Sequence, residues 1–183
     1  MKKDRLKIAA ILVIIICICS CEDNSRRKIA KTIQNMQENV MVIPKDLIAI
    51  RNGEIIPFKD SASIRRRLIV YYDSTDCTSC NISHLHDFHP LFSADSSMAS
   101  FQLLVIFSPK AKENKLTVEN ICYKAFPHTI YVDTLGSFAK LNPYLPASSL
   151  YHTFLSDENG KLLLIGNPLS SAEMWELFIN NIK

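Results

Sequence analysis

Two thiols, Cys77 and Cys80, form a C-x-x-C motif shortly after an apolar run. That run, residues 68–72, is rich in β-branched and aromatic side chains, which is typical of a buried central strand. The motif begins five residues later and opens a segment with helical periodicity that continues to about Phe92. A thiol pair at a strand–helix junction predicts an α/β chain in which the pair has a chemical role.

The rest of the chain alternates in the same way between strand and helix patterns. Asn52-Gly53 separates two apolar runs and predicts a β-hairpin, because both residues tolerate positive φ. Further strands are expected at 103–107, 129–132, 151–155 and 161–165, the last two joined by a turn at 157–160, and helices at 27–42, 116–126, 136–141 and 171–182. The predicted fold class is therefore α/β, with a central mixed sheet flanked by helices.

The start of the chain has the pattern of an export signal. A basic segment precedes the apolar run 8–18, whose eleven residues span about 17 Å as a helix, roughly half of a bilayer's hydrocarbon core. This predicts a secretory signal peptide over residues 1–20. The alternatives to a lipoprotein signal are an ordinary cleaved signal or a buried N-terminal strand.

The end of that segment, Ile18-Cys19-Ser20-Cys21, resembles the lipobox of bacterial lipoproteins. The resemblance implies that Cys21 carries acyl chains and anchors the protein to a membrane of the cell envelope. Residues 21–45 would then form a lipid-anchored tether with an amphipathic helix, and residues 46–183 the folded domain. Disulfides persist in such a compartment.

Charge and glycine content exclude several functional classes. The net charge of +3 is carried by the first seven residues, so the remainder is neutral and has no electrostatic footprint for nucleic acid. The chain has four glycines, at positions 53, 136, 160 and 166, and they form neither a dinucleotide fingerprint nor a P-loop. No nucleic-acid partner and no cofactor are expected.

The C-x-x-C spacing suits thiol–disulfide exchange. The unpaired amides at a helix start favour the thiolate of Cys77, and Cys80, one turn further, can close a disulfide and release a bound partner. A zinc site would need a second cysteine pair, but outside the export segment only Cys122 remains, which is expected to be a buried, inert thiol. A purely structural disulfide is the other alternative.

Several segments in the same order resemble TlpA-like thiol–disulfide oxidoreductases of the redoxin family. These are 53–58, 68–72, Cys77-Thr-Ser-Cys80, 131–136 and 153–161, so the resemblance covers about residues 46–182. It implies a thioredoxin-like fold with an N-terminal β-hairpin and a strand–helix insertion. It also implies protein thiol or disulfide substrates, with Cys77 as the attacking thiol and Cys80 as the resolving thiol.

The chain departs from this family at two positions beside the thiols. Asp76 stands where the family usually has an aromatic residue before the first cysteine. Tyr151 or His152, depending on register, stands where the family has a cis-proline. These departures leave open a second hypothesis, a non-catalytic thioredoxin-fold binding module or a Cu(I) metallochaperone.

Four side chains are candidates for tuning the thiols: Asp76, His84, Tyr151 and His152. Asp76 is expected to cap the helix and to disfavour a second negative charge at Cys77, which favours a reductant. His84 shares a helical face with Cys80 at 100° per residue, which predicts a core histidine, a tuning group or a third Cu(I) ligand. His86 and His89 are expected to face solvent.

Replacement of Cys21 by alanine tests the anchor. We expect Cys21→Ala to release the protein from membranes or to leave it unprocessed, because the remaining tether has no apolar segment long enough to hold it. Fractionation of membranes and mass analysis of the N-terminus measure both effects. A variant that stays membrane-bound and correctly processed would disprove the lipobox assignment.

Overall fold

The computed structural model describes residues 24–58, 66–98 and 101–182, so the signal segment and Cys21 lie outside the described residues. The chain divides into two units, Met1–Glu38 and Asn39–Lys183. Within the described ranges, no helix has the length and apolarity needed to cross a bilayer.

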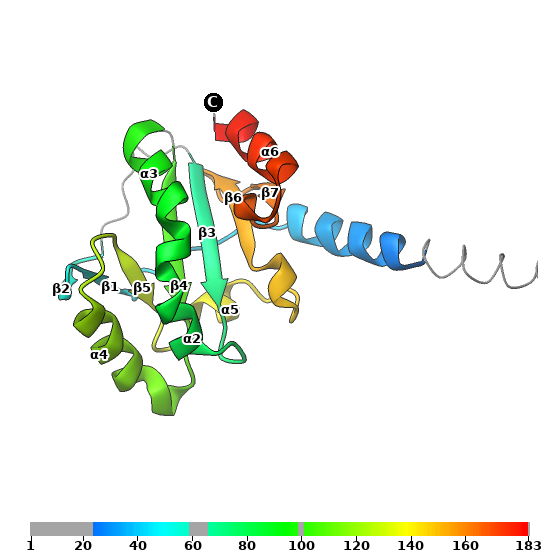
Figure 1. Cartoon of the computed structure of the whole chain (residues 1–183). Helices are drawn as coiled ribbons and strands as arrows, with labels where there is room; N and C mark the ends of the chain where they lie inside the picture. The colour runs from blue at the N-terminus through cyan, green and yellow to red at the C-terminus, as the bar shows by residue number, and fades with distance from the viewer. Residues whose placement is uncertain (1–23, 59–65, 99–100, 183) are drawn as a thin grey trace, which may run out of the picture. The chain divides into compact units, whose positions relative to one another are not determined.

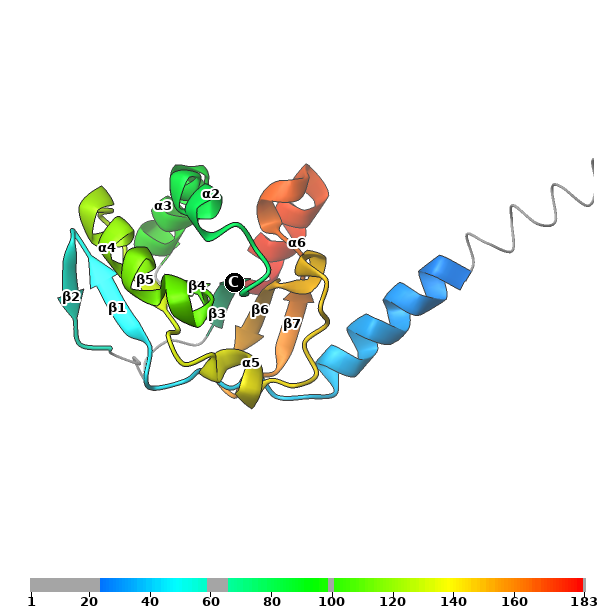
Figure 2. The same cartoon turned by 90° about the horizontal axis from the view of Figure 1, so that it is seen from below.

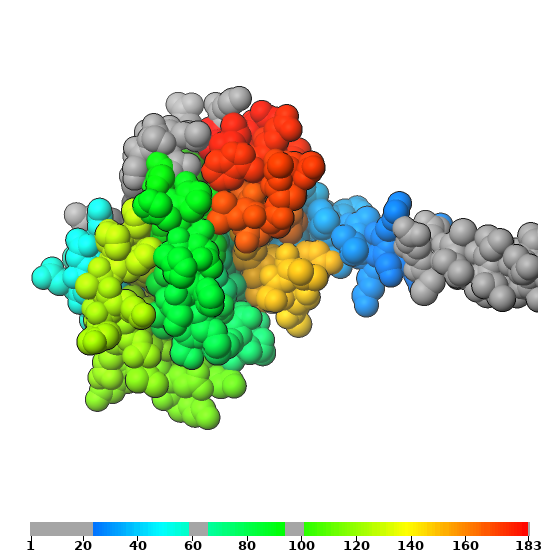
Figure 3. Space-filling view, viewed as in Figure 1, coloured from blue at the N-terminus to red at the C-terminus, as the bar shows by residue number. Residues whose placement is uncertain are grey.

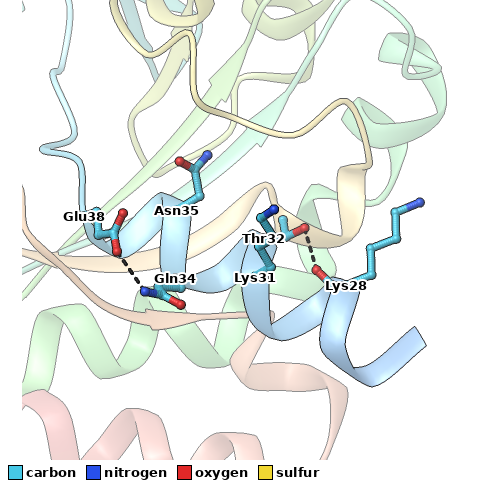
Figure 4. Close-up of a pocket in the computed structure, with 6 residues that line it drawn as sticks. All are labelled: Lys28, Lys31, Thr32, Gln34, Asn35 and Glu38. Atoms are coloured by element: carbon cyan, nitrogen blue, oxygen red, sulfur yellow. Dashed lines mark hydrogen bonds between the residues drawn. The ribbon is translucent and has the colours of Figure 1, made fainter. Parts of the chain in front are cut away.

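In the first unit, residues 24–37 are helical. Thr32 Oγ1 donates a hydrogen bond to the Lys28 carbonyl (3.0 Å), and Gln34 Nε2 donates to Glu38 Oε1 (2.9 Å), as Figure 4 shows. The helix was predicted over 27–42, but in the structure it ends at residue 37. Val40 forms an antiparallel bridge to Lys161, and the Met41 amide donates to the Gly160 carbonyl (2.7 Å).

The second unit contains a seven-stranded mixed sheet with the order β2-β1-β5-β4-β3-β6-β7 (Figure 1). The strands are β1 Ile48–Arg51, β2 Glu54–Ile56, β3 Arg66–Tyr72, β4 Gln102–Phe107, β5 Ile130–Val132, β6 Thr153–Asp157 and β7 Leu162–Ile165. The α-helices are α2 Thr78–Ser83, α3 His89–Met98, α4 Asn114–Lys124, α5 Ser137–Leu141 and α6 Ala172–Ile182. The predicted β-hairpin is confirmed, with Asn52 (φ 51°) and Gly53 (φ 81°) at its turn.

Strand β3 lies between two neighbours of opposite direction. It pairs in parallel with β4 and antiparallel with β6. The thioredoxin-like arrangement consists of β3, the helices α2 and α3, and β4, followed by β6, β7 and α6. The β1–β2 hairpin and the inserted β5 and α5 are additions to it. The predicted fold is therefore confirmed.

Helices cover both faces of the sheet (Figures 1 and 2). On one face, alternate residues of β3 and β4 pack with side chains of α2 to α4 and α6. That core contains Leu68, Val70, Ile82, Leu85, Leu103, Val105, Ile121, Phe178 and Ile182. On the other face, Phe138 of α5 packs against Tyr71 (ring centroids 4.6 Å apart) and Phe154 (6.5 Å).

The helical segment after the C-x-x-C motif is interrupted. Helix α2 ends at Ser83, a 3₁₀ turn covers Leu85–Phe88, and α3 begins at His89. Pro90 prevents one continuous helix from running through residues 86–90, because it has no amide hydrogen for the His86 carbonyl and its ring would clash with that carbonyl. In the first turn of the new helix α3, proline is accepted.

Helix α4 ends on a residue whose conformation favours glycine. Ala125 is exposed and left-handed (φ 46°, ψ 44°). We expect Ala125→Gly to raise the free energy of unfolding by roughly 0.5–1 kcal/mol, because relief of the left-handed strain exceeds the extra backbone entropy. Urea denaturation measures it.

Ala139→Gly is the matched control, because Ala139 is also exposed but lies inside α5. Glycine there should destabilise the protein by about 1 kcal/mol. Equal destabilisation by both substitutions would contradict the assignment of strain to Ala125.

Candidate functional site

Cys77 and Cys80 form a disulfide at the end of the central strand. β3 ends at Tyr72, a short turn follows, and Cys77 is the N-cap of α2. The two Cα atoms are 5.3 Å apart, and both cysteines are exposed. The Cys77 carbonyl accepts a hydrogen bond from the Asn81 amide (3.0 Å), which begins the helix. Figure 3 shows α2 and the residues after it at the surface of this face of the unit.

Ser79, inside the motif, is a polar neighbour that the sequence reasoning missed. Its Oγ lies 3.7 Å from Cys77 Sγ, within hydrogen-bonding distance for sulfur. A hydroxyl at this position can donate to a thiolate at Cys77. The only signal in the sequence was the residue's place between the two cysteines.

Asp76 does not cap α2 as predicted. Its Oδ2 accepts a hydrogen bond from the Asp73 amide (3.0 Å), and its own amide donates to the Asp73 carbonyl (3.2 Å). The N-cap, Cys77, makes no side-chain capping bond. The carboxylate closes the turn before the helix, which leaves the first amides of α2 without a carboxylate cap.

The turn concentrates negative charge beside the disulfide. Burial would raise the pKa of Asp73, but hydrogen bonds from the Thr75 hydroxyl and amide, together with His152 and the Asp76 amide, lower it below the usual value. Burial, followed by the charges of Asp76 and Asp87, raises the pKa of Tyr72 to about 12.

A groove of about 500 Å³ opens beside Cys77. It lies between α2 and the start of α4, and it is lined by Asp76, Cys77, Ser79, Lys110, Glu113 and Leu116 among others. Lys110 and Glu113 were not predicted as site residues. They follow β4, and only the parallel pairing of β3 with β4 brings the ends of these strands to one edge of the sheet.

His152, and not Tyr151, immediately precedes β6. Tyr151 belongs to a 3₁₀ turn, Ser149–Tyr151, and is half-buried. The His152 side chain is buried, and its Nε2 lies 2.8 Å from the Pro146 carbonyl oxygen. Its Nδ1 is buried without a hydrogen-bond partner in the described part of the chain. His152 and Asp76 both line a second hollow, of about 470 Å³, next to Tyr72.

His84 is exposed, contrary to its predicted place on the apolar face beneath Cys80. Its Nδ1 lies 3.3 Å from Asp87 Oδ2. Within α2 the buried side chains are Thr78 and Ile82, whereas Cys80 is exposed. His84 follows Cys80 by one helical turn, with its amide bonded to the Cys80 carbonyl (3.2 Å), and so it lies on the same exposed face. The predicted grouping of His84 with the two thiols as Cu(I) ligands gains no support, because its Nδ1 faces Asp87 and the two thiols are joined in a disulfide.

The other predicted side chains lie close to expectation. His86 and His89 are exposed, as predicted. Cys122 is a free cysteine, but it is half-buried at the edge of the core and not fully buried.

Comparisons with known proteins found structural similarity only. No protein-family model matches the chain, and no curated protein matches its sequence. StoA from Bacillus subtilis has a TM-score of 0.47 and 19% identity, with 74% of this chain and 98% of that chain covered. A Chlorobium tepidum protein proposed to be the thiol:disulfide interchange protein DsbE has a TM-score of 0.47 and 15% identity, with 67% of this chain and 83% of that chain covered.

An uncharacterized thioredoxin-like protein from Porphyromonas gingivalis has a TM-score of 0.41 and 14% identity, covering 79% of this chain and 92% of that chain. Similarity at this level does not extend to activity. The thioredoxin-like fold of this chain is given by its own strand order and connections.

Replacement of Asp76 by asparagine isolates its charge, because the amide oxygen can still accept the Asp73 amide hydrogen. We expect the pKa of Tyr72 to fall from about 12 but to stay above 10, since burial is the larger cause of its shift. In the reduced protein, Cys77 should be alkylated faster near neutral pH, by at most about fivefold, the factor for unit charges ~4 Å apart in water.

Ultraviolet titration of tyrosinate and iodoacetamide kinetics measure these effects, and Tyr72→Phe identifies the Tyr72 transition. If neither quantity changes in Asp76→Asn, the Asp76 charge does not act on this site.

Proposed function

We propose that this protein is a thiol–disulfide oxidoreductase of the cell envelope that acts on protein disulfides. The observation that carries the proposal is the exposed Cys77–Cys80 disulfide at the start of α2, beside a groove that can receive a polypeptide segment. The thioredoxin-like fold supports it, since this fold presents the motif at the open edge of its sheet.

The reaction follows from the two thiols. The Cys77 thiolate attacks one sulfur of a substrate disulfide, whose S–S bond breaks and releases the other sulfur as a thiolate. This forms a mixed disulfide between Cys77 and the substrate. The Cys80 thiolate then attacks Cys77 Sγ, which breaks the mixed disulfide and releases the second substrate thiolate. The substrate gains two electrons, and the protein is left with the Cys77–Cys80 disulfide.

The charges around Cys77 favour the reducing direction. The carboxylates of Asp73 and Asp76 lie in the turn that precedes it, and negative charge nearby disfavours the thiolate. A protein whose reduced form gains little from thiolate stabilisation is a weak oxidant and a better electron donor. The Ser79 hydroxyl has the opposite effect, because a hydrogen bond donated to the Cys77 sulfur favours the thiolate.

The proposal includes anchoring at Cys21. A lipidated Cys21 would hold the domain at a membrane surface, in a compartment where disulfides form. A protein that reduces disulfides would find its substrates in that compartment. Its substrates would then be exported or envelope proteins with accessible disulfides.

Trapping with Cys80→Ala tests the proposed reaction. Without the resolving thiol, the mixed disulfide at Cys77 cannot be released, so we expect adducts that run at higher mass on non-reducing gels and disappear with dithiothreitol. The matched control is Cys77→Ala, which keeps one exposed thiol but lacks the attacking group. Absence of adducts with Cys80→Ala, or equal adducts with both variants, would refute the proposal.

A further inference from the structure

Three exposed side chains converge at the 3₁₀ turn after α2. His84 Nδ1 lies 3.3 Å from Asp87 Oδ2, and His86 Nε2 lies 3.0 Å from Asp87 Oδ1. One donor atom from each residue lies within 4.8 Å of the other two. Side chains three residues apart eclipse in a 3₁₀ turn, which brings His84 over Asp87. The break in the helix at Ser83 therefore creates this cluster.

The His86 ring has an oxygen acceptor at each nitrogen. Its Nδ1 lies 3.2 Å from the Ser83 carbonyl oxygen, and its Nε2 faces Asp87. A neutral imidazole has one N–H, so it can satisfy one of these two oxygens. Metal-binding histidines commonly donate one N–H to a backbone carbonyl and present the other nitrogen to the ion. The bond to Ser83 gives His86 this arrangement, with Nε2 directed at the carboxylate.

The distances also match a coordination shell. Zn–N bonds of about 2.0–2.1 Å and Zn–O bonds of about 2.0–2.2 Å at tetrahedral angles separate the ligand atoms by roughly 3.3 Å. Each imidazole nitrogen already lies at about this separation from one of the two Asp87 oxygens: His86 Nε2 is 3.0 Å from Oδ1, and His84 Nδ1 is 3.3 Å from Oδ2. All three side chains are exposed, so rotation of the rings can bring the two imidazole nitrogens to the same separation.

We propose that His84, His86 and Asp87 bind one divalent transition-metal ion, such as Zn²⁺. Two imidazoles and a carboxylate are the ligands that zinc and its neighbours prefer, and alkaline-earth ions favour sites built from oxygen alone. The remaining coordination positions are open to water or to a ligand from a partner. This site does not use Cys77 or Cys80, and it stands whether or not the oxidoreductase proposal holds.

His89 provides the matched control. It is exposed and lies two residues beyond Asp87, but it is not one of the three residues whose donor atoms converge. Loss of His89 therefore changes the local histidine content without removing a ligand of the cluster.

Zinc titration of the oxidised full-length protein tests the proposal, with calorimetry for affinity and NMR of the histidine ring nitrogens for the ligands. Oxidation closes the Cys77–Cys80 disulfide and removes both thiols as competing ligands. We expect a saturable zinc site whose affinity falls more than about tenfold in His84→Ala and in His86→Ala and is unchanged in His89→Ala. The ring resonances that shift should be those of His84 and His86.

Absence of saturable zinc binding to the unmodified protein would overturn the proposal. Wild-type affinity in His84→Ala or His86→Ala, or an equal loss in His89→Ala, would overturn it as well. Circular dichroism of each variant separates loss of a ligand from loss of the fold. Cys80→Ala trapping does not depend on these histidines, so failure of one proposal is distinguishable from failure of the other.

Discussion

The pairing of β3 with β4 on one side and β6 on the other is the constraint on which the site depends. β3 is buried along most of its length, and its two neighbours fix where it ends. The Ser108 amide donates to the Tyr72 carbonyl (2.8 Å), so the ends of β3 and β4 are held together. The turn after β3 and the loop after β4 therefore open at one edge, where Cys77 meets the groove residues Lys110 and Glu113.

The turn between β3 and α2 decides the electrostatics of this edge. The Asp76 carboxylate accepts the Asp73 amide, and the Asp73 carboxylate accepts the Thr75 amide and hydroxyl, so neither carboxylate caps α2. The first amides of α2 thus remain available to a thiolate, while the two negative charges oppose it. The balance of these effects, with Ser79 as an added donor, sets how readily Cys77 ionises.

The pattern of the sequence predicts the fold well because each element has a local signal. The apolar run of β3, the Asn52-Gly53 turn and the spacing of α6 each reflect short-range preferences that the tertiary structure keeps. His84 shows where this reasoning fails. Helical spacing places His84 on the face of Cys80, but spacing alone does not tell which face is buried. In the structure Thr78 and Ile82 form the buried face of α2, and the face of Cys80 and His84 is exposed.

Contacts between distant segments were beyond local patterns for a different reason. Lys110 and Glu113 line the same groove as Cys77 because of strand pairing, so the sequence around these two residues contains no signal of the site. The turn geometry of Asp76 was also hidden, because an aspartate before a helix can cap it or close the preceding turn. The choice depends on the position of the Asp73 backbone, which the end of β3 fixes.

The start of β6 is held by three hydrogen bonds of His152, two of which a proline could not make. The His152 amide donates to the Ser149 carbonyl (3.0 Å), and proline has no N–H to replace this bond. The His152 carbonyl accepts the Tyr71 amide (2.9 Å), and the ring nitrogen at Pro146 fixes the side chain beneath the preceding loop. No peptide bond in the described ranges is cis. His152 therefore joins the 3₁₀ turn to β6 through backbone and ring hydrogen bonds. These bonds, and not the restricted φ angle of a proline, hold the loop in its conformation.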